Sequence, residues 1–365
     1  MIQWRLGTVR STLRLRQGLV ELEVDCEGGV RRALLYDGLT GEAQPGDTVV
    51  LNATAVDLGL GSGGSDFVAH VYHRLPEDRP GPGHIVKLRY TPYQLACLAS
   101  EEPASPHHGD FRAGPAGSEL KGIPVVACCL HSQVAPACAA AAAAGRRVAY
   151  VHTDGGALPA VFSDSVWALR SEGVIAAVVT AGHAFGGDLE AVGVHSGLIA
   201  ACRAACAEVV VAGMGPGVVG TGTRWGTTAL EQGEIINAAA VLGGEPLAAL
   251  RLGAGDPRAR HQGVSHHCLT SLGRVAMARA TVVLPVLASE RRRELVTELE
   301  RAGVLPKHRL VTANGNAGLR LLKDLGIPLR TMGRDEIEAG EFFAAAAAAG
   351  AAAAGTAARG RDERG

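Results

Sequence analysis

Apolar and polar positions alternate along the first 75 residues of the chain. Residues 19–24 and 48–51 show this alternation, which is typical of strands with one buried face. Turn signals such as Asp37-Gly38 and Pro45-Gly46 separate the short runs, and no convincing helix interrupts them. Closely spaced short strands predict a small all-β domain over residues 1–75, either a barrel or a sandwich.

Proline and glycine punctuate residues 76–120. We expect a last strand near residues 84–90, followed by a connecting segment. Long loops without secondary structure are uncommon inside compact domains. This segment is therefore expected to join two domains or to cover part of a site.

From residue 121 to residue 342, apolar runs of strand length alternate with segments of helix length. Seven strands alternating with helices predict an α/β domain with a parallel sheet. We favour an open, doubly wound sheet; a closed barrel of eight units is the alternative, for which the chain is slightly short. The predicted strands are 123–129, 147–152, 174–180, 208–213, 247–252, 281–287 and 309–313, and the predicted helices are 134–144, 163–170, 196–207, 227–242, 265–278, 289–302 and 317–325.

Residues 343–365 form an alanine-rich, low-complexity tail. Alanine favours helix, but the segment has no apolar and polar face and glycines interrupt it, so a frayed or disordered tail is expected. No stretch approaches about 18 uninterrupted apolar residues, and no membrane span is expected. The N-terminus lacks the apolar core of a signal peptide. With eight cysteines and no C-x-x-C pair, reduced thiols in a cytoplasmic protein are the simplest account.

Composition excludes one class of partner. The 365 residues carry a formal net charge of -1, whereas a nucleic-acid-binding protein needs a basic surplus to displace counterions from phosphates. Aromatic residues make up only 4% of the chain, too few for a platform on which bases stack. A homo-oligomer remains open.

Titratable, polar and glycine residues follow the predicted strands at one end of the sheet. His131 follows the first strand, Asp154 the second, His183 the third and Asp256 the fifth. Loops at the opposite end look ordinary. Ligands of open α/β sheets bind outside the carboxyl ends of the strands, so this one-sided enrichment predicts a binding crevice there.

A glycine loop follows the fourth strand, with Gly215, Gly217 and Gly220 in G-x-G-x-x-G spacing. Such glycines let backbone N–H groups approach an anion. A nicotinamide dinucleotide is disfavoured, because the next strand-end acid, Asp256, lies about twice as far along as the ribose-binding acid should. A phosphate or carboxylate site is preferred, and a tight turn is the structural alternative. The expected anion-binding residues are Gly215, Gly217, Gly220, Thr221, Thr223, Arg224 and Arg258.

Two histidine-rich segments follow other strands. His183, Asp188, Glu190 and His195 lie close together in the chain, and such residues can bind a divalent metal or carry acid–base chemistry. No H-E-x-x-H or closed Cys/His motif is present. A structural role, with Asp188 capping a short helix, is the alternative.

The second segment, residues 256–267, is richer in histidine and arginine. Ser265 is expected to cap a helix, which places His266 and His267 in its first turn, where cations are unfavourable and imidazoles stay neutral. Arg258 can clamp an anion; a solvated basic loop is the alternative. The expected catalytic residues and metal ligands are His183, Asp188, His195, His266 and His267, with Asp154, Asp256, His261 and His131 as alternates for the metal. Thiolate catalysis by Cys128 or Cys129 beside His131 is discounted, because buried cysteines are usually inert.

Several long motifs resemble a bacterial family known only as a domain of unknown function. They are residues 46–64, 182–196, 213–225 and 256–267, and the resemblance spans about residues 1–340. It implies that the β domain and the α/β region form one recurring unit. It implies no reaction, cofactor or catalytic residue.

Two functional hypotheses follow. The first is an enzyme of hydrolysis or group transfer that acts on a small anionic metabolite and uses a metal-activated water if a metal is present. The second is a non-catalytic metabolite-binding or regulatory module whose β domain docks a partner. An enzyme needs two titratable groups near one reacting atom, so the geometry of the site distinguishes the two.

Overall fold

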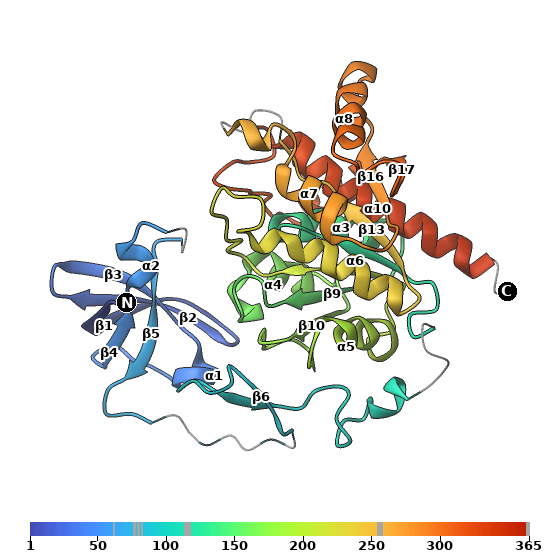
Figure 1. Cartoon of the computed structure of the whole chain (residues 1–365). Coiled ribbons are helices and arrows are strands. Elements are labelled where there is room, and N and C mark those ends of the chain that lie inside the picture. Colours follow the sequence, from blue (N-terminus) through green and yellow to red (C-terminus); the bar gives the residue numbers. More distant parts are fainter. Residues whose placement is uncertain are drawn as a thin grey trace. The chain divides into compact units, whose positions relative to one another are not determined.

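The structure is a computed structural model (Figure 1) that describes residues 1–60, 63–75, 78, 81, 83–112, 118–253 and 258–362. The chain divides into two compact units. The first contains Met1–Pro82 and Leu88–Ala96, and the second contains Gly83–Lys87 and Cys97–Gly365. Each unit is described by itself below.

The first unit contains a closed five-stranded barrel in the order β1-β2-β3-β5-β4. Most neighbouring strands are antiparallel, and β3 and β5 are parallel. Alternate side chains such as Leu22, Val24, Val49 and Leu51 point inward and form its core, as the alternating pattern predicts. The elements are β1 (Trp4–Arg16), β2 (Leu19–Cys26), β3 (Gly29–Leu35), α1 (Asp37–Thr40), β4 (Thr48–Asn52), α2 (Thr54–Asp57) and β5 (Ser65–Val71).

The connecting region contains the strand expected near residues 84–90. It is β6 (Ile85–Lys87), and it belongs neither to the barrel nor to the large sheet that follows. A second short strand is β7 (Leu95–Cys97). Strand β6, with Lys87 at its end, therefore belongs to the α/β unit.

The second unit is built on an eight-stranded sheet in the order β11-β10-β9-β12-β8-β13-β16-β17. All neighbours in it are parallel, and the sheet is open, as predicted. One strand, β11, was not predicted. The strands of this sheet are β8 (Pro124–Ala127), β9 (Val148–Thr153), β10 (Ala177–Ala181), β11 (Leu189–Ala191), β12 (Val209–Met214), β13 (Glu245–Ala249), β16 (Thr281–Pro285) and β17 (Arg309–Ala313); β14 (Leu252–Gly253) and β15 (Gly263–Val264) pair separately.

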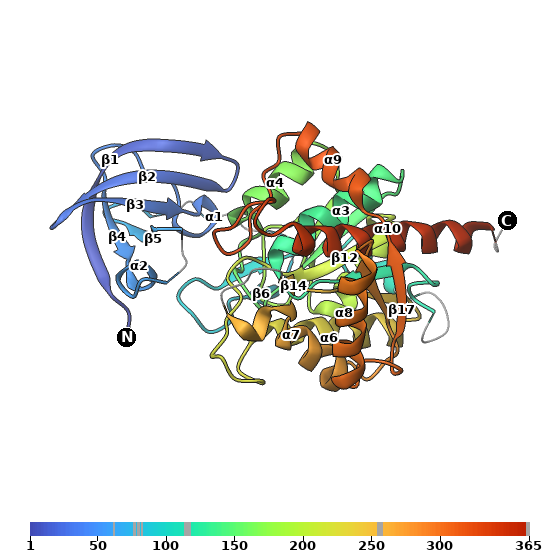
Figure 2. The same ribbon diagram turned by 90° about the horizontal axis from the view of Figure 1, so that it is seen from above.

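Helices cover both faces of the sheet (Figures 1 and 2). Successive residues of one strand serve opposite faces, so that Val125 packs in one core and Val126 in the other. Residues from α3 and α4 pack in the core of one face, residues from α5, α6, α7 and α8 pack in the core of the other, and α10 contributes residues to both. The helices are α3 (Val134–Ala143), α4 (Asp164–Ser171), α5 (Val194–Ile199), α6 (Glu231–Val241), α7 (His266–Thr270), α8 (Ser289–Arg301), α9 (Asn316–Asp324) and α10 (Gly340–Asp362), with π-helical turns at Ala200–Ala204 and Ser271–Val275 extending α5 and α7.

The prediction of a frayed or disordered tail is wrong. Helix α10 spans Gly340–Asp362 and packs on α3, α9 and the strands β8, β13 and β16. Its Ala345 and Phe343 are fully or almost fully buried, and Figure 2 shows it crossing the sheet beside α3. A helix that is buried on all sides is apolar all round. It therefore shows no amphipathic pattern, and the absence of that pattern does not indicate disorder.

Helix α10 also bears on the membrane expectation. By length and composition alone, Gly340–Arg359 would be able to cross a membrane, and most of this stretch is buried inside the protein. In the structure, α10 packs against α3 and against strands of the sheet. The sequence analysis expected no segment of this length and apolarity, and α10 is one. Because most of it is buried, it packs as a core helix does.

Glycine at position 350 makes the close packing of α10 possible. A Cβ at Gly350 would lie 2.0 Å from the backbone oxygen of Ala137 in α3, whereas nothing lies within 4 Å of a Cβ at Gly355 in the same helix. We expect Gly350→Ala to lower the free energy of unfolding by about 2 kcal/mol through overpacking. Gly355→Ala should raise it by up to about 1 kcal/mol through helix propensity alone.

Chemical denaturation of the two variants, followed by circular dichroism, measures this difference. A stabilised Gly350→Ala protein would contradict the packing of α10 against α3.

Candidate functional site

The order of the strands creates a switch point between β8 and β12. The chain leaving β8 crosses β12 to reach β9, whereas the chain leaving β12 crosses β8 to reach β13. Because the two connections run in opposite directions, they leave a crevice outside the carboxyl ends of these neighbouring strands. The sequence analysis predicted a site somewhere along the carboxyl edge of the sheet. The strand order favours one position on that edge, between β8 and β12.

A cavity of about 230 Å³ lies at this switch point. The end of β8, the end of β12 and a segment after α9 form its walls. It is lined by Leu130, His131, Ser132, Pro216, Gly217, Val218, Arg330, Thr331 and Met332. A larger hollow beside α8, lined by charged residues such as Arg293 and Glu298, does not lie at the strand ends.

Two buried glutamine side chains fix the strand ends beside the cavity. The Gln133 oxygen accepts a hydrogen bond of 2.9 Å from the Cys129 N–H, and its nitrogen donates to the Leu250 carbonyl at 2.9 Å. The Gln232 nitrogen donates to the Ala249 carbonyl at 2.8 Å. Sequence reasoning missed both roles, because Gln133 directly precedes one predicted helix, Gln232 lies inside another, and a single glutamine carries no signal.

The glycine loop is held against the sheet by close backbone packing. A Cβ at Gly215 would lie 2.3 Å from the Ala157 oxygen, and one at Gly156 would lie 2.3 Å from the Gly215 oxygen. Gly217 has φ of 95°, a conformation that favours glycine. A Cβ at Gly220 would lie 3.7 Å from His267 Nε2. The first two glycines of the motif thus have structural explanations, and the third brings the loop to a histidine.

The far end of this loop is exposed and bonded to itself. The Thr221 and Thr223 hydroxyl oxygens lie 2.9 Å apart, and the Thr221 N–H donates to the Gly226 carbonyl. Arg224 is exposed. The loop therefore folds as a small hairpin, and the predicted roles of these residues in anion binding stay predictions.

Three histidines come together at the start of α7. The ring centroids of His266 and His267 are 3.9 Å apart, and those of His261 are 5.1 and 5.2 Å from them. One ligand nitrogen from each lies within 4.8 Å of the others. Ser265 caps α7, as predicted, and its hydroxyl also contacts His261 Nδ1 at 2.8 Å. Among the described residues, this is the group of three or more side chains that could hold a metal ion.

The surroundings of these imidazoles keep them neutral. Burial lowers the pKa of His267 to about 4, with contributions from His266 and from three nearby arginines. Burial lowers the pKa of His266 as well, and Arg260 and Arg251 act in the same direction. Neutral imidazole is the form that binds metals or accepts a proton.

Arginine side chains border both the histidines and the cavity. Nη2 of Arg251 and Nη2 of Arg258 lie 3.3 and 2.9 Å from the Met332 sulfur, and Met332 lines the cavity. Arg251 is buried. Arg251 and Arg258 thus contact the cavity wall through Met332, and their charges act on the neighbouring histidines. We call the cavity lining, these two arginines and the three histidines the arginine–histidine site.

His131 lines the cavity in a fixed orientation. Its Nδ1 donates to the Met214 carbonyl at 3.1 Å, which leaves Nε2 to accept from the Ser163 hydroxyl at 2.7 Å. Burial lowers the pKa of His131 to about 4, and His152 contributes. Ser163 is buried and caps α4 by accepting from the Val166 N–H. His131 is thus separate from the other three histidines.

Glu231, at the start of α6, is a titratable group that sequence reasoning missed. Burial raises its pKa from 4.5 to about 7; the Thr153 hydroxyl opposes this shift, and the charge of Asp154 adds to it. A Cβ at Gly155, after β9, would lie 2.7 Å from Glu231 Oε2. An acid in the first turn of a helix looks like an ordinary partner of the helix dipole, so its sequence position gave no signal.

Unsatisfied polar atoms gather along the same edge. Buried polar groups normally have hydrogen-bond partners, and each exception is a place where a ligand or water can bind. Among the described residues, buried atoms of this edge that lack a protein partner include His152 Nδ1, Gln232 Oε1, His266 Nε2 and His267 Nδ1.

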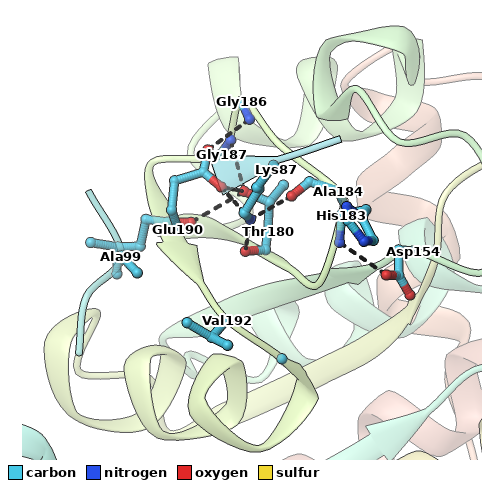
Figure 3. A network of polar contacts seen from close by, with 12 residues as sticks. Lys87, Ala99, Asp154, Thr180, His183, Ala184, Gly186, Gly187, Glu190 and Val192 are labelled. Atoms are coloured by element: carbon cyan, nitrogen blue, oxygen red, sulfur yellow. Dashed lines mark hydrogen bonds and ion pairs between the residues drawn. The ribbon is translucent and has the colours of Figure 1, made fainter. Parts of the chain in front are cut away.

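The other histidine-rich segment has a structural explanation, shown in Figure 3. Lys87 from β6 is fully buried, and its Nζ donates to the Thr180 and Ala184 carbonyls at 3.0 and 2.5 Å. It also pairs with Glu190 Oε2 at 2.6 Å. Glu190 lies in β11, the strand that was not predicted, and its other oxygen accepts from the Gly186 N–H.

The structure does not bring His183, Asp188 and His195 together. Asp188 pairs with Arg170 on the surface, and His195 is exposed on α5. The His183 N–H donates to Asp154 (Figure 3), so the Asp154 carboxylate has a backbone partner. Among the described residues, the side chains of this segment form no group of three that could hold a metal ion. Asp256 lies outside the described residues.

The cysteines agree with the prediction of unpaired, mostly inert thiols. All eight are free. Burial raises the pKa of Cys128, and the hydrogen bond to Cys268, followed by burial, raises that of Cys129. Cys129 and Cys268 have their sulfur atoms 3.2 Å apart. A nucleophilic thiolate at Cys128 or Cys129 is therefore not supported.

The Lys87–Glu190 pair should contribute strongly to stability. Removing one partner of a buried ion pair leaves an uncompensated charge and costs about 3–5 kcal/mol. The Arg170–Asp188 pair in the same region is exposed and should contribute less than about 1 kcal/mol. We therefore expect Lys87→Met to lower the melting temperature far more than Arg170→Met does, as measured by differential scanning calorimetry.

Substituting both partners, Lys87→Met with Glu190→Gln, should restore part of the loss. Equal, small effects of Lys87→Met and Arg170→Met would contradict the buried position of Lys87.

Comparison with known proteins adds a family but no activity. A family model described as "Protein of unknown function (DUF3866)" matches residues 32–350. The match covers the greater part of the chain and spans both units, in agreement with the resemblance seen in the sequence. It extends into α10, beyond the boundary expected near residue 340. No curated protein and no solved structure matches the chain.

Proposed function

We propose that this chain, which belongs to the DUF3866 family of proteins of unknown function, binds a small anionic metabolite in the cavity between the ends of β8 and β12. The reaction class that we infer is hydrolysis or group transfer. The observation that carries the proposal is the arginine–histidine site: two guanidinium groups converge on Met332 at the wall of a switch-point cavity.

Charge and position both support an anion. Guanidinium groups bind carboxylates and phosphates through paired, charge-assisted hydrogen bonds. Arg330 lines the cavity as well. The glutamine clamps and the packed glycines hold the strand ends rigidly, which a binding site for a small molecule requires.

Acid–base groups stand on either side of the end of β12. His131 Nδ1 is bonded to the Met214 carbonyl, and a Cβ at Gly155 would lie 2.7 Å from Glu231 Oε2 and 3.4 Å from the Met214 Cβ. A carboxyl group with a pKa of about 7 can exchange protons at neutral pH, as general acid–base catalysis needs. Glu231 therefore favours an enzyme over a binding module.

We propose the cytoplasm as the place of this activity. Eight free cysteines support a reducing compartment.

Arg258 provides the direct test of anion binding. It borders the cavity through Met332 and is only partly buried, so its loss should leave the fold intact. Charge-assisted hydrogen bonds contribute about 1.5–3 kcal/mol, and we expect Arg258→Ala to weaken the binding of inorganic phosphate by ~10- to 100-fold in isothermal titration calorimetry. Arg292→Ala, on the exposed face of α8, is the matched control and should bind as the wild type does.

Equal affinities of Arg258→Ala and Arg292→Ala would overturn the proposed site. Anion binding without turnover of a panel of phosphate esters and carboxylic esters would favour the regulatory module over the enzyme.

Glu231 should make stability depend on pH in a specific direction. Its pKa is about 7 in the folded protein and about 4.5 in the unfolded chain, so the unfolded state loses the proton first and stability falls as pH rises from about 4.5 to 7. Glu231→Gln removes this loss. The variant should gain on the order of 1–3 kcal/mol relative to the wild type between pH 5 and pH 8.

Urea denaturation at the two pH values measures the gain. Glu234→Gln, at an exposed position of the same helix, is the control and should show a small change at both. A gain that is equal at pH 5 and pH 8 would contradict a protonated, buried Glu231.

A further inference from the structure

We propose that His261, His266 and His267 bind one divalent zinc-type ion and that the anion of the cavity supplies its remaining ligand. The anion part of this inference rests on the proposed function above. The assignment selects one set of three side chains from the wider group that the sequence suggested, and it excludes His183, Asp188 and His195.

The geometry of the three imidazoles is close to that of a metal centre. Their ligand nitrogens lie within 4.8 Å of one another. Zinc–nitrogen bonds of about 2.1 Å in a tetrahedron place the nitrogens roughly 3.4 Å apart. The nitrogens would therefore have to approach one another by up to about 1.4 Å, and rotation about the side-chain bonds of the histidines is the movement available for this.

Unsatisfied nitrogen atoms point to a missing ligand. Within the described part of the chain, His266 Nε2 and His267 Nδ1 are buried and have no hydrogen-bond partner, and His267 is only 5% exposed. Leaving such an atom unsatisfied costs about 1–3 kcal/mol, and a bound ion would remove this cost for both. His261 Nδ1 contacts the Ser265 hydroxyl, an outer hydrogen bond of the kind that orients metal-binding imidazoles, so we assign its Nε2 to the metal.

The charge around the site explains why an anion should complete it. The group contains histidines but, among the described residues, no carboxylate or thiolate. Within the described residues, the arginines whose charges act on His266 and His267 are Arg251, Arg258 and Arg260. Imidazole ligands carry no negative charge to offset that of a dication, and three of them leave a coordination position open, which an oxygen of a phosphate or carboxylate would fill.

The structure also connects the cavity to the histidines. Gly217 and Val218 line the cavity, and Gly220 in the same loop lies beside His267. Arg258 contacts Met332, which lines the opposite wall. An anion in the cavity can therefore contact the arginines while one of its oxygens reaches the metal, where the ion would activate water or polarise the bound group.

Reciprocal binding is the decisive test. Zn²⁺ at micromolar concentration is titrated into the metal-free, full-length protein with and without inorganic phosphate, and phosphate is titrated with and without Zn²⁺. We expect one equivalent of zinc, whose affinity rises by ~10-fold or more with phosphate; linkage requires the same factor for phosphate with zinc.

Variants assign the ligands. His266→Ala with His267→Ala should abolish zinc binding, and His195→Ala, an exposed histidine of α5, should leave it unchanged. His261→Gln and His266→Gln keep polar side chains of similar size and serve if the double variant does not fold. The Co²⁺-substituted protein should show a tetrahedral visible spectrum without a thiolate charge-transfer band, which excludes Cys268 as a ligand.

The outcomes separate this inference from the proposed function. Phosphate binding that persists while zinc fails to bind, or zinc binding that survives the histidine substitutions, overturns the metal site and leaves the anion site standing. Zinc binding that is indifferent to phosphate overturns the coupling. If phosphate also fails to bind by itself, the proposed function fails with it.

Discussion

The structure depends on one requirement: a parallel sheet must bury both of its faces. The central strands of the large sheet, such as β8, β9 and β12, feed alternate side chains into two separate cores, and helices cover each of them (Figures 1 and 2). The faces are therefore unavailable to ligands, and the carboxyl edge is where loops and polar side chains can collect. The reversal of direction between β8 and β12 then selects one place on that edge.

The spacing of apolar residues along the chain predicted the strands and helices whose formation depends on their own sequence. The barrel strands, the seven longer strands and most helices follow from period and length, and the serine cap of α7 follows from its position. Two features depend on partners distant in the chain. Helix α10 is ordered because Gly350 meets Ala137 of α3, and β11 is a strand because it pairs with β10 and holds Glu190 against Lys87. Neither partner is visible in the segment itself.

The same distinction applies to the candidate site. The sequence placed its candidate residues, including the pair His266 and His267, at the carboxyl edge of the sheet, because residues that follow parallel strands must share an edge. It could not separate them from His183 and Asp188, since only the tertiary contacts show that Asp188 pairs with Arg170. Arg251 and Glu231 went unnoticed for a related reason: an arginine at a strand end and an acid in the first turn of a helix are common. Their meaning comes from burial and from neighbours.

The central claim is that the arginine–histidine site binds an anion. The most direct measurement is a crystal structure of the protein with tungstate, a tetrahedral oxyanion whose tungsten atom is located by anomalous scattering. The account predicts one strong peak in the cavity between the ends of β8 and β12, within hydrogen-bonding distance of Arg258 and on the side of His267. A cavity without a peak, or a peak held only by residues elsewhere in the chain, would contradict it.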